Sequence, residues 1–238
     1  MKQRLDTELT KRGLVISRSQ AESWIKLGKV TVDGAVITKP GHVVRDESVI
    51  KLMAAEQYVS RAGLKLASVA KLLQLSFKDK TVLDVGSSTG GFTDYALQNG
   101  AKKVFAVDVG TEQLHSNLRT DSRIELHEKT DIRDFYLEEK PDIIVIDVSF
   151  ISLREILPHL AKNLSSPSTE IAAMLKPQFE AGKYQINKGV IKNDAVRRQI
   201  LKEFEVWAKQ YFFLQDKRDS DVHGAKGNQE RFYLLKVK

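Results

Sequence analysis

Cysteine is absent from this chain of 238 residues, which excludes disulfides and thiolate metal sites. The five histidines are scattered without ligand spacing, so we expect no bound metal. No uninterrupted apolar run is long enough to span a bilayer, and no apolar stretch follows the first four residues as it would in a secretory signal. We therefore expect a soluble, cytoplasmic protein with no membrane partner.

The charge balance is basic but not extreme. With 38 Lys and Arg against 31 Asp and Glu, the formal net charge is +7, which favours a polyanionic partner. Apolar residues make up 42% of the chain, enough for a core, and the length suits one large domain or two modest ones.

The central motif is T-V-L-D-V-G-S-S-T-G-G-F, residues 81–92. It predicts a buried strand, a tight glycine turn and the start of a helix, whose amide groups would face a ligand. Neither the dinucleotide pattern G-x-G-x-x-G nor a phosphate loop ending in G-K-[ST] is present. Asp108 ends the next strand-like run, 24 residues after Asp84 (108 − 84), where an acidic group can bind a ribose diol. This arrangement suits S-adenosylmethionine, and the alternative is an ordinary turn that needs glycine for its geometry alone.

Strands and helices alternate from this motif onward. Their order predicts a doubly wound, Rossmann-like α/β domain with a mostly parallel sheet and ligands at the C-terminal strand ends. The expected strands are 81–85, 103–107, 124–127, 142–147 and 171–175, with a late pair at 211–214 and 231–237. The expected helices are 62–75, 92–99, one from about 112, 131–135, 152–164 and most of 190–210.

Charged residues stand at three predicted strand ends. Asp147 and Lys176 each end an apolar strand, and Glu230 precedes the last one. Because an isolated buried charge is costly, we expect these groups to face one another, with Lys65 from the helix 62–75 as a fourth member. The alternatives are a structural ion pair for Glu230 and a lysine that extends from a half-buried helix for Lys65.

Residues 1–56 differ from the rest. Two helical segments, the second capped by Ser17 or Ser19, precede short strands with a D-G turn at 33–34, which predicts a small α+β module. The string S-R-S-Q-A-E-x-W-I-x-x-G-x-V-x-V-D-G resembles the RNA-binding domain first described in the fourth protein of the small ribosomal subunit. The resemblance implies contacts with structured RNA from Arg4, Arg12, Arg18, Gln20, Lys26 and Lys29. The alternative is a solvated charged face, because Asp6, Glu8 and Glu22 lie among them.

Further segments extend the resemblance over nearly the whole chain. Y-V-S-R-A-G-L-K-L, L-D-V-G-S-S-T-G-G-F-T-D, I-D-V-S-F-I-S-L, L-K-P-Q-F-E and K-G-N-Q-E-R-F look like segments of the TlyA/hemolysin A family. That family joins the RNA-binding module to a methyltransferase domain similar to the FtsJ-type ribose methyltransferases. The resemblance implies an RNA-binding domain at 1–56, a linker at 57–60 and a methyltransferase domain at 61–238.

Site residues follow from the resemblance, position by position. The family's Lys-Asp-Lys-Glu catalytic tetrad falls on Lys65, Asp147, Lys176 and Glu230. The S-adenosylmethionine site falls on Asp84, Gly86, Ser88, Thr89, Gly90, Gly91, Phe92, Asp108, Val109, Asp131, Ile132 and Asp147. The chain departs from the family pattern with Ala62 in place of glycine, Asp131 in place of asparagine and a single glycine at 110.

The activity implied is methyl transfer from S-adenosylmethionine to a ribose 2′-hydroxyl of ribosomal RNA. Lys176 would act as the base or orient the hydroxyl, and Asp147 would align Lys176. Lys65 and Glu230 would position the hydroxyl or its phosphate. Two alternatives remain: a non-catalytic RNA-binding or ribosome-assembly protein with this fold, and a membrane-active hemolysin.

Overall fold

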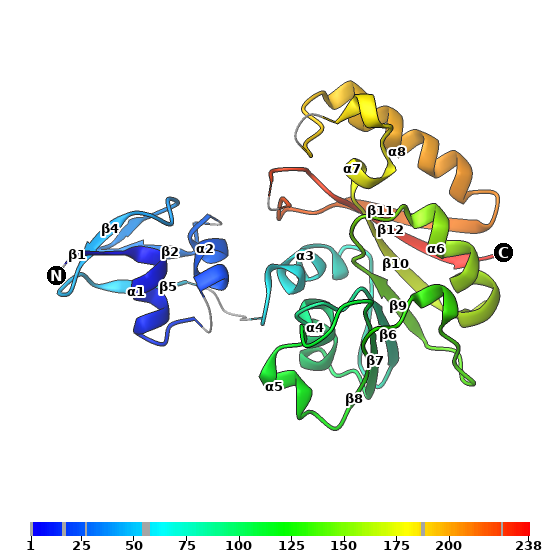
Figure 1. Ribbon diagram of the computed structural model, residues 1–238, viewed down its shortest axis with the longest axis horizontal. Helices are drawn as coiled ribbons and strands as arrows, with labels where there is room; N and C mark the ends of the chain where they lie inside the picture. The colour runs from blue at the N-terminus through cyan, green and yellow to red at the C-terminus, as the bar shows by residue number, and fades with distance from the viewer. Residues whose placement is uncertain (1, 16–17, 27, 54–57, 187–188, 225) are drawn as a thin grey trace. The chain divides into compact units, whose positions relative to one another are not determined.

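The computed structural model describes residues 2–15, 18–26, 28–53, 58–186, 189–224 and 226–238 (Figure 1). The chain divides into two compact units, Met1–Arg61 and Ala62–Lys238. Of the expected features, Ser17 and residue 57 of the linker lie outside the described residues.

The first unit is a small α+β fold. Its elements are β1 (Lys2–Arg4), α1 (Leu5–Lys11), α2 (Arg18–Lys26), β2 (Val30–Val32), β3 (Ala35–Val36), β4 (Val43–Arg45) and β5 (Ile50–Leu52). Strands β3, β2 and β5 form one sheet, and β1 pairs with β4. Leu5, Leu9 and Ile25 are fully buried where the two helices pack. Asp33 and Gly34 both have positive φ, as the predicted D-G turn requires.

The second unit contains a seven-stranded sheet in the order β11-β12-β10-β9-β6-β7-β8. Its strands are β6 (Thr81–Val85), β7 (Lys103–Val107), β8 (Ile124–His127), β9 (Ile143–Ile146), β10 (Glu170–Leu175), β11 (Phe212–Asp219) and β12 (Arg231–Val237). The first five are parallel, and β12 is antiparallel to both neighbours. The predicted doubly wound, mostly parallel fold is confirmed.

Helices cover both faces of this sheet (Figure 1). On one face, α6 (Leu153–His159) and α8 (Asp194–Ala208) pack against a core that includes Ile146 and Leu175. On the other lie α3 (Arg61–Ala70) and α4 (Gly91–Gln98), where the ring of Phe92 contacts that of Phe232, 5.9 Å between centroids. Since side chains alternate along a strand, Glu230 shares the face of Phe232, toward α3 and α4.

Several helices differ from their predicted bounds. The helix expected at 62–75 ends at Ala70 and closes in a turn where the Leu75 amide donates to the Ala70 carbonyl and Gln74 has φ +56°. The helix expected from about 112 begins later, because Glu112 has φ +55°. It is the short α5 (Ser116–Arg119). Segments 131–135 and 160–164 are a 3₁₀ turn (Ile132–Asp134) and a π-helical turn (Leu160–Leu164).

Candidate active site

The glycine turn after β6 brings two strand ends together. Gly86 has φ +81°, and a β-carbon there would lie 2.9 Å from the carbonyl oxygen of Asp147. Only glycine lets the backbone approach this closely. Gly90, also left-handed, precedes α4, and a β-carbon would meet Leu118 and Leu114 at 2.4 and 2.6 Å. Gly90 therefore serves the packing of α5 against the turn.

Asp84 is fully buried at the end of β6. Its Oδ2 accepts from the Thr93 amide (2.9 Å) and hydroxyl (2.6 Å) at the start of α4. Its Oδ1 is buried and has no hydrogen-bond partner among the described residues. Burial raises the pKa of Asp84 to about 7, although the bonds from Thr93 oppose that rise. A buried acceptor left open in this way fits a ligand's ammonium group.

Asp108 follows β7 and holds the turn in shape. One carboxylate oxygen accepts from the Ser88 amide (2.8 Å) and the other from the Gly110 amide (2.7 Å). Two backbone amides thus fix the carboxylate, whose remaining lone pairs can accept from two neighbouring hydroxyls. This is the geometry that a ribose diol requires.

Two adjoining cavities open along these strand ends. The larger, about 370 Å³, is lined by Asp108, Val109, Asp131 and Ile132 among others. The smaller, about 220 Å³, is lined by Asp84, Thr89, Phe92 and Lys176 among others. Gly86, Ser88, Asp147 and Ser149 belong to both walls, so the cavities adjoin. A long ligand can extend from one to the other.

Asp131 stands on the wall of the larger cavity. Its carboxylate accepts from the Arg133 side chain at 2.6 and 3.0 Å and from the Arg133 amide at 2.9 Å. The hydrogen bond from Arg133 lowers the pKa of Asp131. The side chain therefore reaches the cavity as a carboxylate, an acceptor for an amino group.

The four charged residues form two ion pairs. Lys176 Nζ lies 2.6 Å from Asp147 Oδ1 and donates to Ser149 Oγ at 2.8 Å. Lys65 Nζ lies 2.5 Å from Glu230 Oε2, and both side chains are buried. Ala62, one turn before Lys65 on α3, lines the same cavity as Lys176 and Asp147. Of these four described residues, Asp147 and Lys176 line a cavity, whereas Lys65 and Glu230 line neither of the two.

The structure brings most of the predicted cofactor residues to the two cavities. Of the rest, Gly90 and Gly91 support the turn and the start of α4. Sequence reasoning missed several lining residues, namely Ser87, Gln113, Val148, Ser149, Phe150 and Ile151. The segment I-D-V-S-F-I-S-L contained four of them, but only its aspartate was singled out. Phe150 has φ +67° and an exposed ring that lies 5.2 Å from the ring of Phe179.

A buried carboxyl group that the sequence did not reveal joins the segment that follows Asp147 to the segment that follows Lys176. Glu180, at the end of α7 (Pro177–Glu180), accepts from the Ser152 hydroxyl at 2.6 Å and the Leu153 amide at 2.7 Å. Burial raises its pKa. Glu180 thus ties the segment after Lys176 to the segment after Asp147.

In the first unit, the basic residues fall into two groups. Arg4 and Arg18 both contact the buried Asp6, and Arg12 bonds Glu8. Arg12 also donates to the carbonyls of Ser48, Asp46 and Arg45. Lys26 and Lys29 are exposed, as are Arg4 and Arg18, but Lys26 has only a long contact to Glu22, 3.8 Å. Gln20 differs from expectation: it is buried and donates to the Tyr58 carbonyl, so it is not offered to RNA on a surface.

Two family patterns match this chain. The pattern of FtsJ-like methyltransferases covers residues 58–237, and that of the S4 domain covers residues 3–50. The fold and site thus define a Rossmann-like methyltransferase with an S4 domain. No helix in the described part of the chain has the length and apolar character to cross a membrane.

Related proteins place the chain more narrowly. It is 45% identical over 184 residues to the 23S rRNA (cytidine-2′-O)-methyltransferase TlyA of Campylobacter jejuni, covering 76% of this chain and 72% of that protein. It is 35% identical over 241 residues to the 16S/23S rRNA (cytidine-2′-O)-methyltransferase TlyA of Mycobacterium tuberculosis, covering 98% and 90%. A structure from Streptococcus thermophilus, provisionally described as a hemolysin, has a TM-score of 0.75 at 39% identity and covers 100% of this chain and 89% of that chain. The chain belongs to the TlyA/hemolysin A family of FtsJ-like methyltransferases.

Proposed function

We propose that this chain transfers a methyl group from S-adenosylmethionine to a ribose 2′-hydroxyl of ribosomal RNA, and that it does so in the cytoplasm, where ribosomes are. The observation that carries the proposal is the Lys176–Asp147 pair on the wall of the smaller cavity, of which Asp147 also lines the larger cavity. Two relatives named for 2′-O-methylation of ribosomal RNA support it.

The cavities fit the cofactor in two parts. The open Oδ1 of Asp84 and the buried Ser87 hydroxyl, which also lacks a partner among the described residues, suit the polar groups of an amino acid end. Asp108 suits the ribose diol, and Asp131 suits an exocyclic amino group of adenine. When bound, S-adenosylmethionine supplies an electrophilic methyl group on a positively charged sulfur.

The chain's own residues handle the hydroxyl. In this proposal Lys176 holds the 2′-hydroxyl oxygen toward the methyl group. Once its ammonium group has given up a proton to water, the neutral amine receives the hydroxyl proton as the new carbon–oxygen bond forms. Asp147 and Ser149 fix the Lys176 ammonium group from two sides. In this proposal Lys65, which is paired with Glu230, contacts the hydroxyl or its neighbouring phosphate. RNA rather than DNA is the substrate, because only RNA carries the nucleophile.

The first unit supplies affinity for RNA in this proposal. We assign RNA binding to residues 1–56, a linker to 57–60 and methyl transfer to 61–238. Among the expected contacts, Lys26 and Lys29 carry exposed charge on and after α2. Such lysines neutralise phosphates and position an RNA without reading its sequence.

The test is methyl transfer with labelled S-adenosylmethionine and ribosomal subunits, followed by nuclease mapping of the modified nucleotide. We expect label on a ribose and loss of transfer in Lys176→Ala, with binding of S-adenosylmethionine retained. Label on a base would overturn the assignment of the tetrad. Full binding of RNA and cofactor without any transfer would favour a non-catalytic assembly protein.

A further inference from the structure

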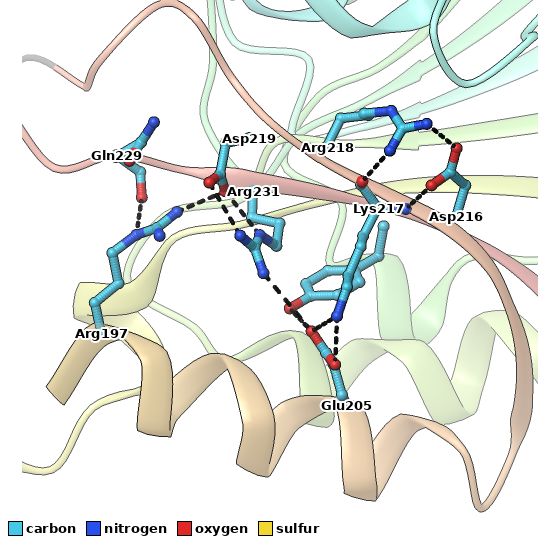
Figure 2. A network of polar contacts seen from close by, with 9 residues as sticks. Arg197, Glu205, Asp216, Lys217, Arg218, Asp219, Gln229 and Arg231 are labelled. Atoms are coloured by element: carbon cyan, nitrogen blue, oxygen red, sulfur yellow. Dashed lines mark hydrogen bonds and ion pairs between the residues drawn. The ribbon is translucent and has the colours of Figure 1, made fainter. Parts of the chain in front are cut away.

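A network of charged side chains joins helix α8 to strands β11 and β12 (Figure 2). Arg197 of α8 donates to Asp219 Oδ1 at 2.6 Å. Arg231 of β12 donates to Oδ1 and Oδ2 of Asp219 at 2.7 and 3.0 Å. Burial favours the neutral form of Asp219, but the two arginines outweigh it and lower its pKa. We call Arg197, Asp219 and Arg231 the Asp219 clasp.

The clasp holds the residues on both sides of Glu230. Arg197 Nε donates to the carbonyl oxygen of Gln229 at 3.1 Å, and Arg231 is bound by Asp219 itself. The amide of Ser220, the residue after Asp219, donates to the carbonyl oxygen of Glu230 at 3.0 Å. Three consecutive residues, 229–231, are thus bound to α8 and to the end of β11.

The preceding residue is tethered as well. Asn228 is buried, accepts from the Ile191 amide at 3.0 Å and donates to the Gly189 carbonyl at 2.8 Å. The Glu230 side chain has little room, because a β-carbon on Gly224 would lie 2.9 Å from its Oε1. The backbone and the side chain of Glu230 are therefore both constrained. Lys65 is paired with this constrained carboxylate.

From this geometry we infer that Arg197 and Asp219 are positioning residues for Glu230 and, through Glu230, for Lys65. The inference rests on the proposed function, because the role of Glu230 in the tetrad belongs to that proposal. An Arg–Asp pair that served stability alone would need no bond to Gln229. Here the same guanidinium group that binds Asp219 also binds the carbonyl next to Glu230.

The other end of the network offers a matched control. Lys217 of β11 contacts both carboxylate oxygens of Glu205 on α8 at 2.8 Å (Figure 2). This ion pair joins the same helix and strand as the Arg197–Asp219 pair. Among the described residues, the Lys217 side chain forms no hydrogen bond or ion pair with residues 228–231, and its partner Glu205 lies 3.8 Å from Arg231 Nη1. Lys217→Met should therefore weaken the α8–β11 contact without releasing Glu230.

Two readouts on the full chain test the inference. Acylation of Lys65 by a soluble N-hydroxysuccinimide ester, mapped by mass spectrometry, reports its pairing with Glu230 in the absence of RNA and cofactor. We expect Asp219→Asn to raise this labelling severalfold and to lower kcat for methyl transfer on the order of tenfold, because small misplacements of reacting groups are costly. The Kd for S-adenosylmethionine should stay within about twofold, because Asp219 lines neither cavity. Lys217→Met should leave all three quantities within about twofold.

Arg197→Lys provides a milder second variant. This variant keeps a positive charge for Asp219 but loses the Nε donor to Gln229. The labelling of Lys65 and the kcat of this variant should therefore fall between those of wild type and Asp219→Asn. The inference is overturned if Lys65 labelling is unchanged in a folded Asp219→Asn or Arg197→Lys protein, or if Lys217→Met has the same effect. If the wild-type chain methylates no RNA, the proposed function is wrong. The labelling of Lys65 still tests whether the Asp219 clasp positions Glu230, because it needs neither RNA nor cofactor.

Discussion

Gly86 and Asp147 approach so closely that a β-carbon on the glycine would lie 2.9 Å from the aspartate's carbonyl oxygen. Gly86→Ala must move either the turn after β6 or the backbone of Asp147, and its φ of +81° adds strain. We expect a loss of about 1–3 kcal/mol in the free energy of unfolding. We also expect more than about tenfold weaker binding of S-adenosylmethionine, measured by calorimetry.

Gly100 provides the comparison for that substitution. It has a similar φ of +88°, but its nearest atom, the Lys78 Cα, would lie 3.4 Å from a new β-carbon. Gly100→Ala should therefore lower stability through strain and leave cofactor affinity within about twofold. Equal loss of affinity in both variants would contradict the assignment of Gly86 to the cofactor turn.

Asp84 should make both stability and cofactor binding depend on pH. Its pKa is raised to about 7 in the folded chain from 3.8, so the unfolded chain loses this proton first as pH rises. The contribution of Asp84 to the free energy of unfolding of the free protein should therefore be greatest below about pH 4. It should fall by on the order of 4 kcal/mol as the pH rises to about 7. Binding of a ligand ammonium should show the opposite trend and strengthen up to about pH 7, since only the ionised carboxylate attracts it.

Asp84→Asn separates this carboxyl group from the others. The asparagine can still accept from Thr93 through its carbonyl oxygen but does not titrate. In this variant, the free energy of unfolding measured in urea between pH 4 and 8 should no longer contain the pH-dependent contribution of Asp84. The affinity for S-adenosylmethionine should no longer change with pH near pH 7. If the pH profile of cofactor affinity is the same in Asp84→Asn as in wild type, the Oδ1 of Asp84 does not contact the ligand.

Glu180 should be essential for stability, although sequence reasoning did not single it out. Glu180→Ala would leave the half-buried Ser152 hydroxyl and the amide of buried Leu153 without their acceptor, which should cost about 1–3 kcal/mol in unfolding free energy. Glu180→Gln keeps a carbonyl oxygen for one of them and should cost less. Denaturant unfolding of both variants tests this order, and an equal loss would contradict the hydrogen-bond account.

The sequence predicted the features that follow from local pattern. The strand observed at 81–85 has its predicted bounds, because β-branched residues begin it and a glycine follows it. Helix ends were missed where Gln74 and Glu112 adopt positive φ, because neither residue type signals that conformation. The strand that ends at Asp219 extends five residues beyond its predicted end at 214, since its charged second half has no apolar pattern.

The candidate site shows the same division. Strand-end position was enough to predict Asp147 and Lys176, whose ion pair the structure contains. The role of Glu180 was not predictable, because its partners lie 27 and 28 residues away in the chain. Arg4, Arg12 and Arg18 appeared equivalent to Lys26 and Lys29 in the sequence, and only the fold shows which of these side chains bond carboxylates.

Lys26 and Lys29 should contribute to RNA binding without contributing to stability. Lys26 has only a long contact to Glu22, 3.8 Å, and Lys29 is exposed. The double substitution to alanine should leave the unfolding midpoint unchanged and weaken RNA binding. Each lost phosphate contact should also reduce the slope of log K against log salt by about 1.

Arg12→Ala is the contrasting variant: it removes donors to Glu8 and to carbonyls of residues 45–48, so it should lower stability by about 1–3 kcal/mol. Filter binding across a salt series tests the lysine variant, and denaturant unfolding of both variants tests their stability. A stable Arg12→Ala protein, or an unchanged salt slope in the lysine variant, would reverse this division of roles.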